Sequence, residues 1–152
     1  MSPAKQTSGE RPKLSNFLCF AIYSANLAFG RAYKPILDKF GLTYTQYIAL
    51  VALGEEDNLT VGALGEKMFL ESNTLTPILK TLQSLGYIER QRDPADERQV
   101  RISLTDAGRA LLDKGIGGSL VEATGLGEEF PQVQKTVVRL RDNLLRATRV
   151  KK

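Results

Sequence analysis

Two short amphipathic helices followed directly by a charged hairpin set the narrowest limit on how this chain can fold. Apolar residues recur at helical spacing over residues 60–69 and 72–85, and Gly86 stands where a helix commonly ends in a left-handed residue. Residues 87–104 then alternate between apolar and polar side chains around Asp93-Pro94, which predicts a β-hairpin. The order helix, turn, helix and hairpin predicts a winged helix-turn-helix, whose second helix would lie in the major groove of DNA.

Helices are also expected on the N-terminal side of this unit. A helix with Ser15 as its cap should begin the ordered chain, because apolar residues follow at helical spacing. Pro35 predicts a kink or a fresh start of that helix, and Gly41 predicts its end. A further, mostly apolar helix is then expected, capped by either Thr43 or Thr45.

Helices are also expected on the C-terminal side of this unit. Thr105 is expected to cap a helix, and the glycines of residues 115–118 interrupt it. A last helix is predicted over about residues 128–148, with an apolar stripe on one face. Residues 1–13 are polar and contain two prolines, which predicts a flexible arm. The expected fold class is therefore mostly α with a small β-hairpin (α+β).

Composition excludes several classes of function. The chain has 152 residues, no histidine and one cysteine, Cys19. Internal disulfides, Cys-rich zinc sites, His-ligated metals and Ser-His or Cys-His dyads are therefore excluded. We expect no cofactor, no metal and no enzymatic activity. The formal net charge of +4 is a mild excess that permits an anionic partner such as DNA without demanding one.

Neither a membrane span nor a secretory signal is expected. No apolar run approaches the roughly 18 to 20 residues that cross a bilayer, and the first residues lack the apolar core of a signal peptide. The sequence therefore predicts a cytoplasmic protein without a membrane partner.

Short polar residues mark the start of the second predicted helix. Asn73, Thr74 and Thr76 could bond to base edges or phosphates there, and Lys80 and Lys67 could add phosphate contacts. Each of these residues, taken singly, could equally cover the solvent side of a helix.

The tip of the predicted hairpin carries Arg98, which suits a narrow, electronegative minor groove. Residues 87–109 contain five arginines and five acids, so this region has no excess of positive charge. Asp96 or Glu97 is therefore expected to hold or aim arginines. A salt-bridge lattice within the hairpin, without a role at DNA, is the alternative.

Three separated segments resemble the MarR family of transcription regulators: Leu64-Gly65-Glu66, Thr74-Leu75-Thr76-Pro77 and Asp93-Pro94-Ala95-Asp96-Glu97-Arg98. Three more segments are similar to the OhrR-type sensors of organic hydroperoxides within that family: Leu18-Cys19-Phe20-Ala21-Ile22-Tyr23-Ser24, Tyr33-Lys34-Pro35 and Leu42-Thr43-Tyr44-Thr45-Gln46-Tyr47. The resemblance covers roughly residues 14 to 110.

The resemblance implies one MarR-type domain over residues 14–152. Its winged helix-turn-helix, about residues 45–105, would stand between dimerisation helices at about residues 14–40 and 106–150. Two chains would form a homodimer that reads a double-stranded, palindromic operator. The reduced protein would act as a repressor, and oxidation of Cys19 by an organic hydroperoxide would release the DNA.

The resemblance also implies roles for single residues. Tyr33 and Tyr44 would be hydrogen-bonded near the Cys19 thiol. Four residues would lie at the DNA: Ser72, Thr74, Thr76 and Arg98.

Four departures from the family pattern stand out. The family usually has Gly at Asn73 and Pro at Thr45, and often Trp at Gly54. Some members carry a second, resolving cysteine within residues 115–130, where this chain has none. The resemblance therefore implies the one-cysteine type of sensor, or a chain altered at that position.

Cys19 has a second reading, because a lone cysteine among Leu18, Phe20 and Ile22 is commonly a small buried hydrophobe. A position in the first helical turn instead favours the reactive thiolate. A low-molecular-weight thiol is expected as a further reactant, since a bulky mixed disulfide would disturb the dimer more than one added oxygen. Three rival functions remain: a regulator that binds a small aromatic ligand, a thiol peroxidase and a non-specific DNA-binding protein.

Overall fold

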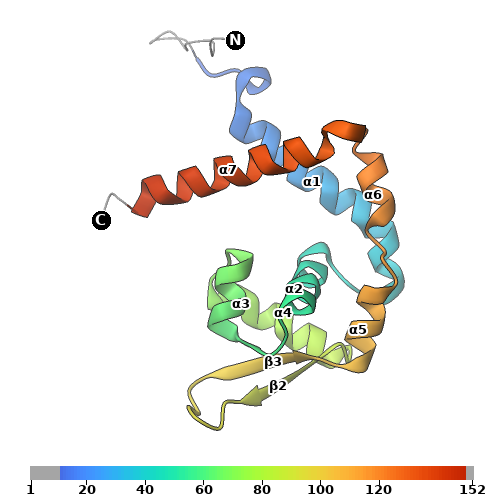
Figure 1. The fold of residues 1–152 in the computed structure, drawn as a ribbon, viewed down its shortest axis with the longest axis vertical. Coiled ribbons are helices and arrows are strands. Elements are labelled where there is room, and N and C mark those ends of the chain that lie inside the picture. Colours follow the sequence, from blue (N-terminus) through green and yellow to red (C-terminus); the bar gives the residue numbers. More distant parts are fainter. Residues whose placement is uncertain (1–10, 150–152) are drawn as a thin grey trace. The chain divides into compact units, whose positions relative to one another are not determined.

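The computed structural model describes residues 11–149, so the first ten residues of the predicted arm lie outside the described part. The chain divides into two compact units, Met1–Tyr47 and Ile48–Lys152, and each is described by itself. The elements along the chain (Figure 1) are η1 (Leu14–Asn16), α1 (Leu18–Leu37), η2 (Asp38–Phe40), α2 (Tyr44–Glu55), β1 (Leu59–Thr60), α3 (Val61–Met68), α4 (Ser72–Ser84), β2 (Ile88–Arg92), β3 (Val100–Leu104), α5 (Asp106–Asp113), α6 (Gly118–Ala123), η3 (Gly127–Glu129) and α7 (Phe130–Arg149).

The first unit is built on one long helix. α1 runs without a break through Pro35, so the predicted fresh start is wrong, whereas the kink stays a prediction. Pro35 lies in the last turn of α1, so the backbone hydrogen bond that it cannot donate affects only the end of the helix. The predicted cap is also wrong, because Ser15 lies inside η1 and Phe17 precedes α1. Gly41, in the left-handed region at φ 70°, ends the segment as predicted.

A reciprocal cap begins α2. The Thr43 hydroxyl accepts a hydrogen bond from the Gln46 backbone N–H at 3.3 Å, and the Gln46 side-chain oxygen accepts one from the Thr43 N–H at 2.9 Å. This pair satisfies two amides that the helix itself cannot. Of the two predicted caps, Thr43 is therefore correct and Thr45 is wrong.

The second unit contains the predicted helix-turn-helix and hairpin. Thr60 caps α3 by accepting a hydrogen bond from the Ala63 N–H at 3.1 Å, and Phe69, at φ 59°, makes the turn toward α4. One apolar face of the two helices and the hairpin is almost fully buried, through Leu64, Leu75, Leu79, Leu82, Ile88 and Ile102. In Figure 1 the hairpin runs beside this helix pair and its turn extends past them.

The hairpin belongs to a three-stranded antiparallel sheet of order β1-β3-β2. The strands β2 and β3 match the sequence prediction, whereas β1 was not predicted. β1 has only two residues, Leu59 and Thr60, which pair with Ile102 and Arg101 of β3. The sheet is therefore three-stranded only at Arg101 and Ile102, and β2 and β3 alone continue toward the tip.

The C-terminal helices differ in how much they bury. Thr105 caps α5 as predicted, by accepting a hydrogen bond from the Gly108 N–H at 3.2 Å. The short helix α6 was not predicted. α7 agrees with the expected last helix, but none of its described residues is buried. No helix in residues 11–149 has the length and apolar character of a membrane span.

Close packing at Gly65 yields a stability prediction. A Cβ at this position would stand 2.7 Å from the carbonyl oxygen of Leu70, a backbone atom that cannot move aside as the end of a flexible side chain could. We expect Gly65→Ala to lower the free energy of unfolding by about 1 to 3 kcal/mol. Gly62→Ala, in the same helix and with open space around it, should be neutral or stabilising by up to about 1 kcal/mol. Urea unfolding followed by circular dichroism checks both, and equal effects would contradict the packing argument.

Candidate functional site

The first turn of α4 presents a polar surface. Ser72, Asn73 and Thr74 are exposed, whereas the next apolar residue, Leu75, is buried. Thr76 is half-buried, and its hydroxyl donates to the Ser72 carbonyl at 2.8 Å, so its oxygen remains as an acceptor. The structure therefore brings the predicted DNA-contact residues of this turn onto one accessible surface.

The start of α4 is also suited to an anion. Glu71, the residue before the helix, makes no capping hydrogen bond with its side chain. First-turn amides without a cap can donate to a phosphate oxygen. Lys80 is exposed two turns further on. Lys67 is instead held by Glu55 at 3.2 Å and by Glu56 at 3.7 Å, which weakens the expectation that it contacts phosphate.

The hairpin tip presents Arg98. The Asp96 carboxylate accepts hydrogen bonds from the Arg98 backbone N–H at 3.1 Å and from its Nε at 3.2 Å. The Arg98 side chain nevertheless remains 91% exposed. Asp96 thus aims an arginine outward, as the sequence suggested, while Glu97 acts through its carbonyl, which accepts from Arg92 at 3.3 Å.

A second group of charges lies at the base of the tip, and the sequence did not reveal it. Asp93 is buried, and its carboxylate accepts hydrogen bonds from the Ala95 N–H and from the Arg101 Nε, each at 2.8 Å. These donors lower the pKa of Asp93, the Ala95 amide most and the Arg101 side chain next. Arg101 also donates to the Asn58 carbonyl at 3.0 Å.

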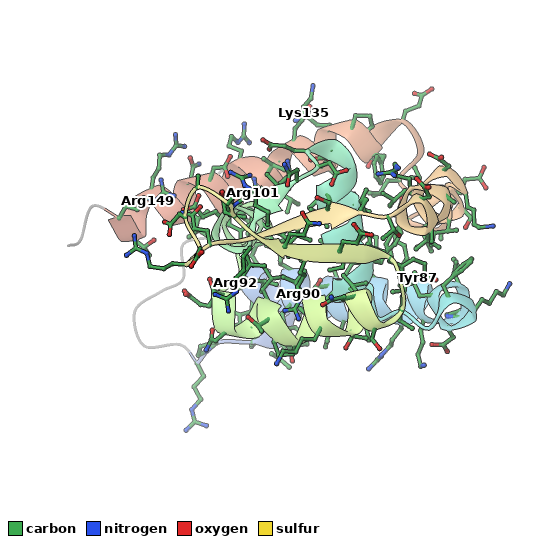
Figure 2. All side chains as sticks on the ribbon, turned by 90° about the horizontal axis from the view of Figure 1, so that it is seen from below. Tyr87, Arg90, Arg92, Arg101, Lys135 and Arg149 are labelled. Carbon is green, nitrogen blue, oxygen red and sulfur yellow. The ribbon has the colours of Figure 1, made fainter. Side chains whose placement is uncertain are left out.

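The two faces of the hairpin carry different arginines. Arg101 pairs with Gln91 across the ladder, so the alternation of a strand turns Arg90 and Arg92 to the other face. Figure 2 shows Arg90 and Arg92 between the hairpin and α4. There the Arg90 Nε donates to the Gln83 side-chain oxygen at 2.6 Å, which joins β2 to α4.

Cys19 is the second residue of α1 and is exposed. The alternative reading as a buried hydrophobe is therefore wrong for the single chain. Its neighbours Leu18, Phe20 and Ile22 are exposed as well, so the thiol lies on an uncovered apolar surface.

The two predicted tyrosines meet at the other end of this unit. The rings of Tyr33 and Tyr44 stack with centroids 4.9 Å apart, and Tyr47 lies 5.7 Å from Tyr33. Burial, and secondarily the neighbouring Tyr33, raises the pKa of Tyr44 and Tyr47. Both hydroxyls therefore stay protonated at neutral pH and can donate hydrogen bonds.

One chain does not bring Cys19 to these tyrosines. Cys19 and Tyr33 lie fourteen positions apart on the unbroken helix α1. At 1.5 Å per residue their backbones are separated by roughly 21 Å. Tyr33 and Tyr44 can therefore not donate to the Cys19 thiol of their own chain.

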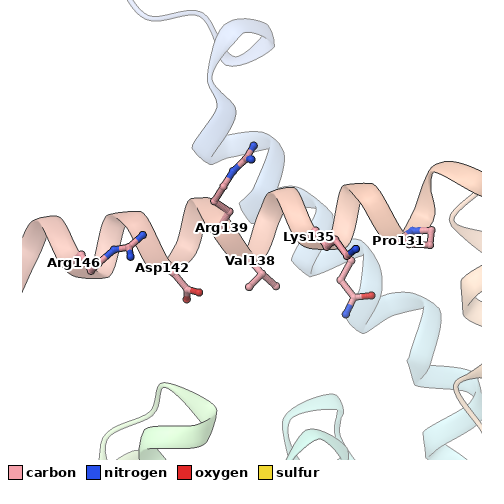
Figure 3. A pocket seen from close by; sticks show the side chains of 7 residues that line it. Pro131, Lys135, Val138, Arg139, Asp142 and Arg146 are labelled. Atoms are coloured by element: carbon pink, nitrogen blue, oxygen red, sulfur yellow. The ribbon is translucent and has the colours of Figure 1, made fainter.

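α7 carries an open hollow of about 500 Å³ along one face (Figure 3). Three cations, Lys135, Arg139 and Arg146, line it together with Asp142. On α7, Arg141 lies 4.5 Å from the ring centre of Phe69, at the helix-turn-helix turn. This helix thus combines a charged face with exposed apolar residues, Val133, Val137 and Leu144.

Comparison with known proteins gives a family match over residues 31–114, to the family described as transcriptional regulator SarA/Rot. The HTH-type transcriptional regulator TtmR of Methylorubrum extorquens is 50% identical over 114 residues, which span 74% of this chain and 58% of that protein. The organic hydroperoxide resistance transcriptional regulator of Bacillus subtilis is 42% identical over 135 residues, or 87% of this chain and 92% of that protein.

Solved structures agree with these relatives. Reduced AbfR bound to DNA is 38% identical, with a TM-score of 0.66 over 82% of this chain and 95% of that one. A MarR transcriptional regulator from Methanosarcina mazei, at 21% identity and a TM-score of 0.69, has the same fold over 84% of this chain and 99% of that one. The winged-helix fold of the MarR type predicted from the sequence is confirmed.

The lowered pKa of Asp93 predicts a distinct response to acid. Its carboxylate stabilises the folded chain above its ordinary pKa of 3.8, and that stabilisation is lost as the pH falls through the lower folded value. Asp93→Asn cannot titrate, so the difference in unfolding free energy between wild type and variant should shrink between about pH 5 and pH 2. Urea unfolding across this range measures it. A difference that stays constant or widens on acidification would contradict the assignment.

Proposed function

We propose, because this chain belongs to the SarA/Rot family of transcriptional regulators, that it is a dimeric repressor that leaves its operator when an organic hydroperoxide oxidises Cys19. The relatives confirm the coarser prediction of a DNA-binding transcriptional regulator. The observation that carries the finer proposal is the exposed Cys19 thiol, on an uncovered apolar surface of a chain that holds a complete winged helix-turn-helix.

In this proposal the DNA is read at two places. The first turn of α4, with Ser72, Asn73, Thr74 and Thr76, lies in the major groove, and Lys80 contacts phosphate. Arg98 enters the adjacent minor groove, for which its outward direction and 91% exposure are suited. A structure of reduced AbfR, a relative of the same fold, contains bound DNA, which supports DNA binding by this fold.

The dimer is proposed from uncovered apolar residues at both ends of the chain. Leu18 and Tyr23 on α1 are 62% and 60% exposed, and Leu144 on α7 is 60% exposed. Large apolar surfaces of this kind usually mark a protein interface. A second copy that covers them gives the proposed domain organisation: residues 14–152 form one MarR-type domain after a flexible arm, residues 1–13. Its winged helix-turn-helix, about 45–105, stands between dimerisation helices at about 14–40 and 106–150.

The sensing site is then assembled from two chains. The rise of α1 keeps Cys19 from the tyrosines of its own chain, so Tyr33 and Tyr44 of the partner subunit complete the site. The hydroxyls of both tyrosines donate hydrogen bonds to the Cys19 sulfur and orient it for oxidation, and burial raises the pKa of Tyr44, which keeps that hydroxyl protonated. The apolar surroundings of Cys19 favour alkyl or lipid hydroperoxides over small polar oxidants.

The proposed reaction converts the thiol to a sulfenic acid. The Cys19 sulfur attacks the terminal peroxide oxygen, an S–O bond forms as the O–O bond breaks, and the thiol proton ends on the departing alcohol. A small thiol can then displace the hydroxyl as water, which leaves a mixed disulfide. Release by a hundredfold to thousandfold requires about 2.7 to 4 kcal/mol. One poorly bonded hydroxyl costs about 1 to 3 kcal/mol, so the bulkier disulfide should act more fully.

We infer that the protein is not an enzyme, because the chain has a single cysteine and a sensor needs to react only once. Its partners are double-stranded operator DNA, a second copy, an organic hydroperoxide and a low-molecular-weight thiol. A cytoplasmic location follows from access to the operator.

Cys19→Ser tests the proposal directly, with a mobility shift on a duplex that the wild-type protein selects from a random pool. We expect wild type to leave the duplex on adding cumene hydroperoxide, and to leave it more fully with a small thiol present. Cys19→Ser should stay bound under both conditions. A serine variant that is released as readily as wild type would overturn the redox mechanism. Release without oxidant, by a small aromatic ligand alone, would favour the ligand-binding rival.

A further inference from the structure

Asp93 ties together the turn that carries the hairpin tip. Besides its two side-chain hydrogen bonds, its backbone N–H donates to the Gln99 carbonyl at 2.8 Å, and its carbonyl accepts from the Asp96 N–H at 3.2 Å. Residues 93–99 are thus closed into a compact turn around one buried carboxylate. Asp96, which aims Arg98, is part of the same turn.

Arg101 connects that turn to the rest of the winged helix. Its Nε bonds the Asp93 carboxylate, and its Nη1 bonds the carbonyl of Asn58, 43 positions earlier in the chain. Asn58 stands in the loop before β1 and α3, in the left-handed region at φ 59°. One guanidinium therefore joins the hairpin tip to the loop that leads into the helix-turn-helix.

The place of Arg101 in the sheet gives this connection its importance. β1 pairs only with Ile102 and Arg101, so the hairpin continues beyond Arg101 as a two-stranded ribbon. Two-stranded ribbons twist strongly and are marginally stable on their own. The guanidinium of Arg101 thus braces the ribbon at the point where the third strand stops supporting it.

We infer that Asp93 and Arg101 are positioning residues, which fix the direction of the hairpin so that Arg98 reaches the minor groove while α4 lies in the major groove. This inference rests on the proposed function. Arg101 acts through Arg98, because two of its three guanidinium nitrogens are engaged by Asp93 and Asn58 and its side chain is 39% exposed, against 91% for Arg98.

The required precision is set by the length of the ribbon. Arg98 lies three residues beyond Arg101, in the turn of residues 93–99, so at most about 10 Å of chain separates them. A tilt of about 15° at Arg101 would displace the tip by up to roughly 2.5 Å, against a tolerance of about 0.5 Å for a working contact. Loss of the brace should therefore cost DNA affinity even where the fold is kept.

The test measures affinity by fluorescence anisotropy at one fixed salt concentration, on the duplex selected by wild type. Asp93→Asn keeps the shape of the side chain and removes its charge. We expect it to weaken binding about tenfold in the wild-type background, comparable to the loss of one charge-assisted contact. In the Arg98→Ala background, the same substitution should change affinity less than twofold. Asp106→Asn is the matched control, because it removes an equal charge from an exposed ion pair with Arg109, and it should leave affinity unchanged.

A second readout separates positioning from general stability. Replacing the A·T pairs of the duplex that flank the α4 contacts by G·C should weaken wild type several-fold and weaken Asp93→Asn much less. Arg101→Lys, which keeps the charge but lacks the second donor nitrogen, should behave like Asp93→Asn. If Asp93→Asn does not fold, the same measurements are made on Arg101→Lys instead.

Several outcomes would overturn the inference. Asp93→Asn that binds like wild type would show that the brace is unnecessary. An equal loss with and without Arg98 would show an independent effect of Asp93. If Arg98→Ala itself binds like wild type, both the inference and the proposed minor-groove contact fall. If the wild-type protein selects no duplex from the random pool, the proposed function itself is contradicted.

Discussion

The unbroken helix α1 holds Cys19 and Tyr33 apart, and the proposed two-chain sensing site follows from that separation. Because α1 runs without a break from Leu18 to Leu37, the Cys19 thiol and Tyr33, on which Tyr44 stacks, are held far apart on one stiff helix. At 1.5 Å per residue no side chain bridges the roughly 21 Å between them. If both ends serve one sensing site, a second chain has to supply the missing half, so sensing and dimerisation become the same structural requirement.

This arrangement places the chemistry inside the proposed interface. Leu18, Phe20 and Ile22 flank Cys19 and are uncovered in one chain, so a partner that covers them also surrounds the sulfur. An added oxygen or a mixed disulfide would then press directly on the contact between subunits. Two α4 helices read a palindrome only at one spacing, and a change at the interface alters that spacing. In the proposal, Asp93 and Arg101 hold the hairpin tip rigid, so that a small movement within the dimer would break the Arg98 contact.

The sequence predicted those parts of the fold that local rules determine. The paired strands β2 and β3, the caps Thr60 and Thr105 and the turn at Gly86 all follow from residues close in the chain. β1 escaped prediction because its two residues are a strand only through pairing more than forty positions away, with β3. The brace of Asp93, Arg101 and Asn58 escaped for the same reason. Pro35 was expected to start a new helix, but a proline disrupts a helix interior more than a last turn, and α1 continues through it. The DNA-contact residues and the redox role of Cys19 rest on residue type and resemblance and stay predictions, whereas the separation of Cys19 from Tyr33 follows from the continuous helix α1.

The rate of Cys19 oxidation in a mixed dimer shows which chain supplies the tyrosines of the sensing site. One chain carries Cys19→Ser and the other carries Tyr33→Phe with Tyr44→Phe, and two affinity tags isolate the mixed species. Its intact thiol then faces the intact tyrosines of the other chain. We expect cumene hydroperoxide to oxidise this thiol at the wild-type rate, while the double tyrosine variant alone reacts slowly. Slow oxidation in the mixed dimer as well would contradict a sensing site shared between two chains.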